Sequence, residues 1–280
     1  MTEYRLIALD IDGTLLNSCG RVTDRTKETV HRVAHAGATI LIATGRRFFT
    51  AKPRVLQLEL PGVLLAGHNG AILKQLDGKL LYHRLLSRDV AQHTVEVAKE
   101  LGFCPIVFAG TDDEATVIVE DYGDRIDAWE HVYLRENQRF LRQVNDLSTD
   151  LPNDVIEVIC VVPIADLHQI AETFEERLNE QVKSIVVTTT DRQHAFIGLT
   201  SPEVSKREPL RYLAQERKID RTEILAIGDN YNDLEMLQFA GMGVVMANAV
   251  PALKQMGFHV TASNDEDGVA EALEKLVLGS

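Results

Sequence analysis

Two aspartates, Asp10 and Asp12, follow the apolar run Arg5–Leu9 near the start of the chain. Side chains two positions apart in an extended backbone start on the same side, so the two carboxylates can converge. At the carboxyl end of a strand in an open α/β sheet, one carboxylate could attack phosphorus while the other handles the proton of the leaving group. Asp12–Gly13 is also a strong signal for a two-residue hairpin turn, and the two interpretations can coexist.

A second group of polar residues, Thr44-Gly45-Arg46, follows the apolar run Thr39–Ala43. The group supplies a hydroxyl, a backbone that can be approached closely at glycine, and a guanidinium, all of which suit phosphate oxygens. A Thr-Gly-Arg triplet is also a common loop sequence, so this motif needs the support of others.

Lys206 lies in the segment Ser205–Glu208, whose ends have the spacing of a capping box and therefore predict the start of a helix. A lysine at a helix N-terminus opposes the macrodipole, which is unfavourable unless an anion binds there. A single lysine is usually a solvated surface charge, so only the accompanying motifs indicate a function for it.

A third carboxylate, Asp229, follows the apolar run Ile224–Ile227 and Gly228, with Asn232 and Asp233 opening a predicted helix. The sheet edge would then carry several hard oxygen ligands without a neighbouring His or Cys, which favours magnesium over zinc. The alternative is helix capping by Asp229 or Asn230, an interaction that contributes about 1 kcal/mol.

The elements that must position these residues alternate between short apolar runs and amphipathic segments, as in βαβ units that build a parallel sheet. Because the runs are apolar on both faces, helices should cover both sides of the sheet. The predicted strands are Arg5–Leu9, Thr39–Ala43, Val63–Ala66, Ile224–Ile227, Gly243–Met246 and Val260–Ala262, with a helix at Thr23–Ala36.

The middle of the chain contains a second α/β set, with predicted helices at Ser87–Leu101 and Ala165–Leu178 and predicted strands at Cys104–Ala109, Ala115–Glu120, Val155–Val162 and Lys183–Thr190. A length of 280 residues favours two domains. We therefore predict an α/β fold in which a Rossmann-like core with a parallel sheet, residues 1–83 and 191–280, is interrupted by an inserted α/β domain, residues 84–190.

The amino-acid composition argues against some classes of binding partner. The net charge of −13 and the absence of a basic stripe argue against nucleic acid. The longest uncharged stretch, Gly241–Leu253, is too short to span a bilayer, so no membrane association is expected. Three widely spaced cysteines and an N-terminus without a signal-peptide pattern favour the cytoplasm. We expect a monomer or small homo-oligomer.

Taken together, the segments Asp10–Thr14, Thr44–Arg46, Lys206 and Gly228–Asp233 resemble the four ordered motifs of the haloacid dehalogenase-like superfamily, in particular its Cof-type sugar-phosphate phosphatases. The insertion between the second and third motifs is similar to the cap domain of that subfamily, and His68–Ala71 is similar to a segment ahead of it. The resemblance covers essentially the whole chain.

The resemblance implies an Mg²⁺-dependent phosphatase that acts on small phosphorylated metabolites such as sugar phosphates. It implies that Asp10 is the nucleophile and a metal ligand, and that Asp12 is the general acid/base whose main-chain carbonyl also binds the metal. Asp229 would be the third protein ligand. The inserted domain would close over the site and select the leaving group.

The same resemblance implies a phosphate-binding set of the Ile11 backbone, Thr44, Gly45, Lys206 and Asn232, with Asp233 and Arg46 in supporting positions. The chain departs from many relatives at one position, because Arg207 follows the motif lysine where they have glycine. That departure makes the local loop shape an open question.

Two other functions remain open on the residues alone. The first is a phosphomutase of the phosphomannomutase type, which would need cap cations to hold a second phosphate; the candidates are His83, Arg84, Arg88, Arg192 and His194. The second, less favoured, is a phospho-acceptor signalling module, which the early Asp10, the nearby Asp12 and the inserted domain all oppose.

Overall fold

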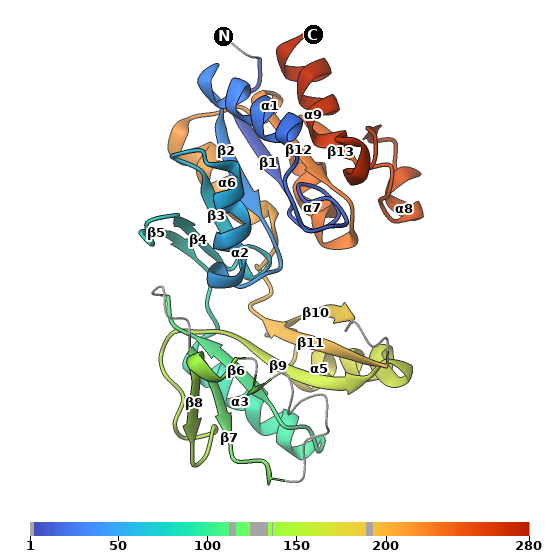
Figure 1. Cartoon of the computed structure of the whole chain (residues 1–280). Helices are drawn as coiled ribbons and strands as arrows, with labels where there is room; N and C mark the ends of the chain where they lie inside the picture. Colours follow the sequence, from blue (N-terminus) through green and yellow to red (C-terminus); the bar gives the residue numbers. More distant parts are fainter. Residues whose placement is uncertain (1–2, 112–115, 124–133, 136, 189–192, 280) are drawn as a thin grey trace. The chain divides into compact units, whose positions relative to one another are not determined.

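The computed structural model describes residues 3–111, 116–123, 134–135, 137–188 and 193–279 (Figure 1). The chain divides into two compact units, Met1–His83 with Ser205–Ser280 and Arg84–Val204. Each unit has its own sheet and its own hydrophobic core. Among the described residues, no helix combines the length and apolar character needed to cross a bilayer.

The first unit contains an eight-stranded sheet in the order β14-β13-β12-β1-β2-β3-β4-β5. The first six strands of that order pair in parallel, while β4 and β5 add an antiparallel edge. The strands are β1 (Leu6–Leu9), β2 (Thr39–Ala43), β3 (Leu64–Gly67), β4 (Ile72–Gln75), β5 (Leu80–His83), β12 (Ile224–Gly228), β13 (Met242–Val245) and β14 (His259–Val260).

Helices complete the first unit: α1 (Asp24–His35), α2 (Phe48–Val55), α6 (Arg207–Arg217), α7 (Leu234–Phe239), α8 (Pro251–Lys254) and α9 (Gly268–Leu273). The Thr23 hydroxyl caps α1 by accepting from the Thr26 N–H. Helix α1 packs against α9, and α6 packs against α7. Every residue of β1 and β12 is buried, as a parallel sheet covered by helices requires.

The strand order reverses at the centre of this sheet. After β1 the chain continues to β2 and β3 on one side, whereas β12 and β13 occupy the other side. Such a switch point is where open α/β sheets bind ligands, beyond the carboxyl ends of the strands. Asp10, Thr44 and Asp229 directly follow β1, β2 and β12, so the fold brings three of the predicted site residues to that edge.

The second unit contains a six-stranded sheet in the order β10-β11-β9-β6-β7-β8. Its strands are β6 (Ile106–Ala109), β7 (Thr116–Glu120), β8 (Leu141–Val144), β9 (Val155–Pro163), β10 (Lys183–Thr188) and β11 (His194–Thr200). Pairing is antiparallel except between β7 and β8. Helices α3 (Arg88–Glu100) and α5 (Leu167–Arg177) both pack against β9 and against each other.

The predicted α/β architecture is confirmed, but the units divide at a different place from the predicted second boundary. The second unit extends to Val204, because β11 pairs with both β9 and β10. Residues 189–192, where the sequence placed the boundary, lie outside the described residues, as does Ala115 at the start of a predicted strand. Membership of β11 depends on strand pairing, which composition along the chain does not reveal.

Candidate active site

The segment after β1 turns back on itself instead of forming a hairpin. Asp10 is only 4% exposed, and its carbonyl accepts a hydrogen bond from Leu15 N–H at 3.2 Å. Gly13 has φ +79°, in the left-handed region that glycine adopts without penalty. The Asp12–Gly13 pair therefore lies in a tight turn, and both neighbours of β1 in the sheet, β2 and β12, pair with it in parallel.

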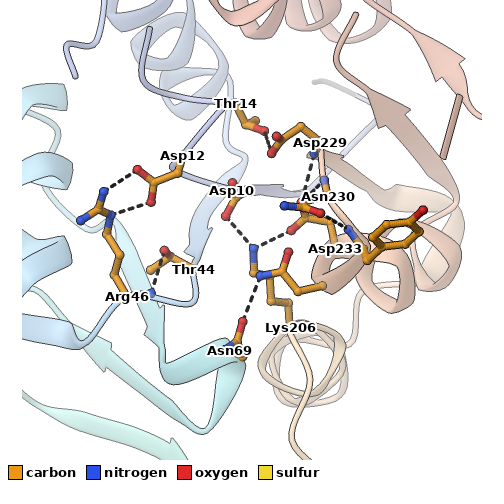
Figure 2. A network of polar contacts seen from close by, with 12 residues as sticks. Asp10, Asp12, Thr14, Thr44, Arg46, Asn69, Lys206, Asp229, Asn230 and Asp233 are labelled. Carbon is orange, nitrogen blue, oxygen red and sulfur yellow. Dashed lines mark hydrogen bonds and ion pairs between the residues drawn. The ribbon is translucent and has the colours of Figure 1, made fainter. Parts of the chain in front are cut away.

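Lys206 lies between two buried carboxylates (Figure 2). Its Nζ is 2.6 Å from Asp10 Oδ1 and 2.6 Å from Asp233 Oδ1. The lysine is 1% exposed and Asp233 is fully buried. The surface-charge interpretation of Lys206 is therefore wrong: the start of α6 inserts the ammonium beside the end of β1.

Asp233 connects Lys206 to the loop after β12. While its Oδ1 accepts from Lys206, its Oδ2 accepts from the backbone N–H groups of Asp229 and Asn230, each at 3.0 Å. Asn230 in turn caps the 3₁₀ turn Tyr231–Asp233 by accepting from Tyr231 N–H. The capping interpretation thus holds for Asn230, and both oxygens of Asp233 are engaged in fixing the loop.

Asp229 instead directs its carboxylate towards the Asp10 loop. Its Oδ1 accepts a hydrogen bond from the Thr14 hydroxyl at 3.2 Å. A Cβ atom on Gly13 would lie only 2.4 Å from Asp229 Oδ2, so a glycine is needed for the two loops to approach. The loops after β1 and β12 thus meet at the Asp229 carboxylate, with Thr14 at its Oδ1 and Gly13 at its Oδ2.

The electrostatics of the site oppose the accumulation of negative charge. Burial raises the pKa of Asp10 to about 8, although Lys206 lowers it and Asp233 raises it further. Burial likewise raises the pKa of Asp229 to about 6, with Asp233 adding to the effect. Burial lowers the pKa of Lys206, but Asp10 and Asp233 outweigh it, so the net shift is upward and the ammonium stays charged.

These carboxylates fit a divalent cation. Ligand oxygens of Asp10, Asp229 and Asp233 all lie within 4.8 Å of one another. Oδ2 of Asp10 and of Asp229 accept no hydrogen bond within the described part of the chain, while both Asp233 oxygens are occupied. A hard, oxygen-only donor set with raised pKa values suits Mg²⁺, whose charge would favour the ionised carboxylates.

The Asp12 side chain is not part of this carboxylate cluster. It is half exposed and accepts two hydrogen bonds from Arg46, from Nε at 2.5 Å and from Nη2 at 2.6 Å. Arg46 N–H donates to the Thr44 hydroxyl oxygen at 3.1 Å, which closes the loop after β2. The first two motifs are therefore joined through the pair formed by Asp12 and Arg46 (Figure 2).

The other predicted phosphate residues surround the same edge. Thr44 is buried and Gly45 is exposed, while the Ile11 side chain lies in the core and only its backbone follows Asp10. Asn232 donates from Nδ2 to Asn69 Oδ1 at 3.0 Å. Asn69 is absent from the predicted site, although its Asn-Gly pair after a strand marks a backbone turn that could have drawn attention.

The open question of Arg207 has a structural answer. Lys206 has φ −62° and ψ −16°, and Arg207 is the first residue of α6, so this backbone accommodates a side chain as well as a glycine. The capping box predicted for Ser205 and Glu208 is wrong. Within the described part of the chain no side chain caps α6, and Glu208 pairs instead with Arg207 and Arg211.

Several cations proposed for a second phosphate make contacts inside the second unit. Arg84 pairs with Glu203, with 2.7 Å between Nε and Oε2. Arg88 donates to the Thr149 carbonyl at 3.4 Å. His194 begins β11 and Arg192 lies outside the described residues. These contacts give Arg84 and Arg88 structural roles within the inserted unit.

Comparison with known proteins gives a consistent family. A family model described as haloacid dehalogenase-like hydrolase matches residues 7–273. A 5-amino-6-(5-phospho-D-ribitylamino)uracil phosphatase of Bacillus subtilis is 30% identical over 281 residues, covering 98% of each chain. Another Bacillus subtilis phosphatase is 26% identical over 297 residues, covering 98% of this chain and 100% of that protein.

A solved structure extends the likeness to the fold. A haloacid dehalogenase-like hydrolase from Bacteroides thetaiotaomicron has a TM-score of 0.79 and 30% identity, covering 97% of this chain and 99% of the other. The fold of the chain is thus similar to that of a solved haloacid dehalogenase-like hydrolase over nearly the whole length of both chains.

Proposed function

The chain belongs to the haloacid dehalogenase-like hydrolases of the Cof type and is a phosphoric monoester hydrolase, and on that premise we propose a Mg²⁺-dependent reaction through an aspartyl phosphate on Asp10. The observation that carries the proposal is the buried Lys206 ammonium between Asp10 and Asp233. Burying three ionisable groups together is costly, and a site for a phosphoryl group explains their retention.

In the first half of the reaction, the Asp10 carboxylate attacks phosphorus in line with the leaving oxygen. A new bond forms between Asp10 and phosphorus as the bond to the leaving oxygen breaks, and Asp12 gives its proton to the departing alkoxide. Lys206 and the Thr44 hydroxyl stabilise the charge that spreads over the equatorial oxygens. Asn232 and the backbones of Ile11 and Gly45 orient the phosphoryl group.

In the second half, the Asp12 carboxylate accepts a proton from water while the water oxygen attacks phosphorus. The bond between Asp10 and phosphorus breaks, which releases inorganic phosphate and restores both aspartates to their starting states. Asp10, Asp229 and the main-chain carbonyl of Asp12 are the proposed Mg²⁺ ligands. When bound, the ion supplies positive charge that screens the carboxylate from the phosphate dianion.

The proposed substrate is a small phosphate ester of a sugar or of a similar polyhydroxylated chain. Support comes from the relative whose name specifies a phosphorylated ribityl group. The net charge of −13 is consistent with small anionic substrates only where local cations such as Lys206 and Arg46 receive them. We propose that residues of the inserted unit select among these esters.

The proposal is tested with p-nitrophenyl phosphate as a generic ester. Wild-type protein should release phosphate with Mg²⁺ but not with EDTA, and Asp10→Asn should lose at least about 10³-fold in kcat. Undiminished activity in Asp10→Asn would rule out the assigned nucleophile. A panel of hexose, pentose and ribityl phosphates, compared by kcat/KM, then identifies the preferred class of ester.

The phosphomutase alternative is separated by the fate of the phosphoryl group. A mutase would transfer it to a second sugar hydroxyl, whereas the proposed hydrolase transfers it to water. The lifetime of the phosphorylated protein separates a signalling module from the hydrolase, because the aspartyl phosphate of a signalling module would persist for minutes without turnover. No described contact specifically favours either alternative, since Arg84 and Arg88 are engaged with neighbouring residues of their own unit.

A further inference from the structure

The turn between β3 and β4 has an unusual backbone. His68, Asn69 and Gly70 form a 3₁₀ turn with three successive positive φ angles of +51°, +53° and +96°. The histidine and the asparagine are buried, at 2% and 6% exposure. Gly70 adopts such a φ angle without penalty, but a left-handed backbone is unfavourable at His68 and Asn69, and backbone strain of this kind clusters at functional sites.

This turn contacts the loop that follows β2. Asn69 N–H donates to the Thr44 carbonyl at 3.0 Å, and His68 N–H donates to the Arg46 carbonyl at 2.9 Å. A Cβ atom on Gly45 would lie 3.0 Å from Asn69 Oδ1, so the Asn69 carboxamide packs directly over that glycine. The turn therefore supports all three residues of the second motif.

The same turn reaches the third and fourth motifs. Asn69 Oδ1 accepts the hydrogen bond from Asn232 Nδ2 at 3.0 Å, across 163 residues of sequence (Figure 2). A Cβ atom on Gly70 would lie 2.2 Å from the carbonyl oxygen of Ser205, which immediately precedes Lys206. One short turn thus touches every segment that carries a proposed phosphate ligand, apart from the loop after β1.

We propose that Asn69 is a positioning residue of the phosphate subsite. Its carboxamide oxygen holds one N–H of the Asn232 amide, which leaves the second N–H of that amide for a phosphate oxygen. Its packing over Gly45 keeps the backbone of the second motif in place. This inference rests on the proposed function, because it assumes that Asn232 and Gly45 receive a phosphoryl group.

Substituting glycine for Asn69 distinguishes a role of the carboxamide in positioning the phosphate subsite from a role of the residue in the backbone turn alone. Asn69→Gly removes the carboxamide, but glycine adopts a φ of +53° without strain, so the fold should be retained. A matched control is Asn179→Gly, which makes the same change at an exposed asparagine with φ +48° in the second unit. Asn69→Gly should weaken inorganic phosphate binding in calorimetry with Mg²⁺ by about tenfold, and Asn179→Gly should not.

A double-mutant cycle tests whether Asn69 acts through Asn232. If it does, Asn69→Gly combined with Asn232→Ala should weaken phosphate binding by less than the product of the two single losses. Losses that multiply, or wild-type phosphate affinity in Asn69→Gly, would overturn the inference. If the wild type binds phosphate but does not hydrolyse esters, the proposed function is rejected and the binding measurements still test the role of Asn69. If the wild type does not bind phosphate, the proposed function and the role of Asn69 are both rejected.

Discussion

Arg46 holds both carboxylate oxygens of Asp12, with Nε 2.5 Å from Oδ2 and Nη2 2.6 Å from Oδ1. The hydrogen bonds that Arg46 donates to Asp12 raise the pKa of Arg46 above its ordinary value. A carboxylate that accepts on both oxygens is fixed in orientation and cannot donate a proton. Under the proposed reaction, Arg46 must release one Asp12 oxygen before Asp12 can protonate a leaving group.

Because Arg46 also orients the Asp12 carboxylate, replacing Arg46 should impair proton transfer. We expect Arg46→Ala to lower kcat by about tenfold to a hundredfold for an alkyl phosphate, because Asp12 loses its orientation. Arg46→Lys supplies a positive charge without a planar pair of donors, so its kcat should lie between that of the wild type and that of Arg46→Ala. The measurement is kcat and KM for alkyl and aryl phosphates. A rise in KM alone would instead mean that Arg46 only binds substrate.

Asp229 should matter for the metal, and Asp12 should serve as its control. We expect Mg²⁺ to raise the melting temperature of the wild-type protein and of Asp12→Asn, because the Asp12 carboxylate lies outside the cluster. Asp229→Asn should lose most of that shift. Melting curves over a Mg²⁺ series provide the measurement. An equal loss in Asp12→Asn would contradict the assigned ligand set.

Removing the buried cation should destabilise the fold. Lys206→Met leaves Asp10 and Asp233 buried without their shared partner, and we expect a loss of about 3–5 kcal/mol in the free energy of unfolding. Above pH 8, the double variant Asp10→Asn with Lys206→Met should recover part of that loss, since asparagine cannot become a second buried negative charge beside Asp233. Urea unfolding without metal measures the free energy of unfolding of the single and the double variant. A wild-type midpoint for Lys206→Met would disprove the prediction.

The raised pKa of Asp10 makes the metal-free stability depend on pH. Between its ordinary pKa of about 4 and the folded value of about 8, the folded protein keeps a proton that the unfolded chain has lost. The contribution of Asp10 is therefore fully present at low pH and is lost as pH rises towards 8. Asp229 adds the same trend up to about pH 6.

Unfolding in EDTA at pH 5 and pH 8 measures this dependence. The free energy of unfolding of Asp10→Asn should fall less than that of the wild type between the two pH values, because asparagine does not titrate. Identical slopes for both proteins would show that Asp10 is ionised throughout this range in the folded state.

The approach of two loops at Gly13 has its own test. In Gly13→Ala, the new Cβ would lie 2.4 Å from Asp229 Oδ2, so we expect kcat/KM to fall about a hundredfold. Gly20→Ala is the control: φ there is +71° with no atom within 4 Å of the added Cβ. It should cost about 1–2 kcal/mol of stability and leave kcat/KM unchanged. Equal kinetic losses would point to backbone strain alone.

Many helices and strands of the first unit could be predicted because apolar runs and capping residues in the local sequence indicate them. The apolar run before Asp10 became β1, buried at every residue, and the helix at Thr23–Ala36 became α1 with Thr23 as its cap. Parallel strands covered on both faces have a continuous apolar signature. Strand β11 was placed in the wrong unit by the predicted boundary, since its membership depends on pairing with β9 and β10.

By itself the sequence determined which residue types follow the strands: Asp10 after β1, Thr44 after β2 and Asp229 after β12. Tertiary structure alone decided their partners. The strand order β12-β1-β2-β3 sets distant loops side by side, so Lys206 became a buried cation between Asp10 and Asp233, and Asn69 met Asn232. Sequence patterns report periodicity and turns over a few residues, whereas ion pairs between distant segments arise only when sheet order brings those segments together.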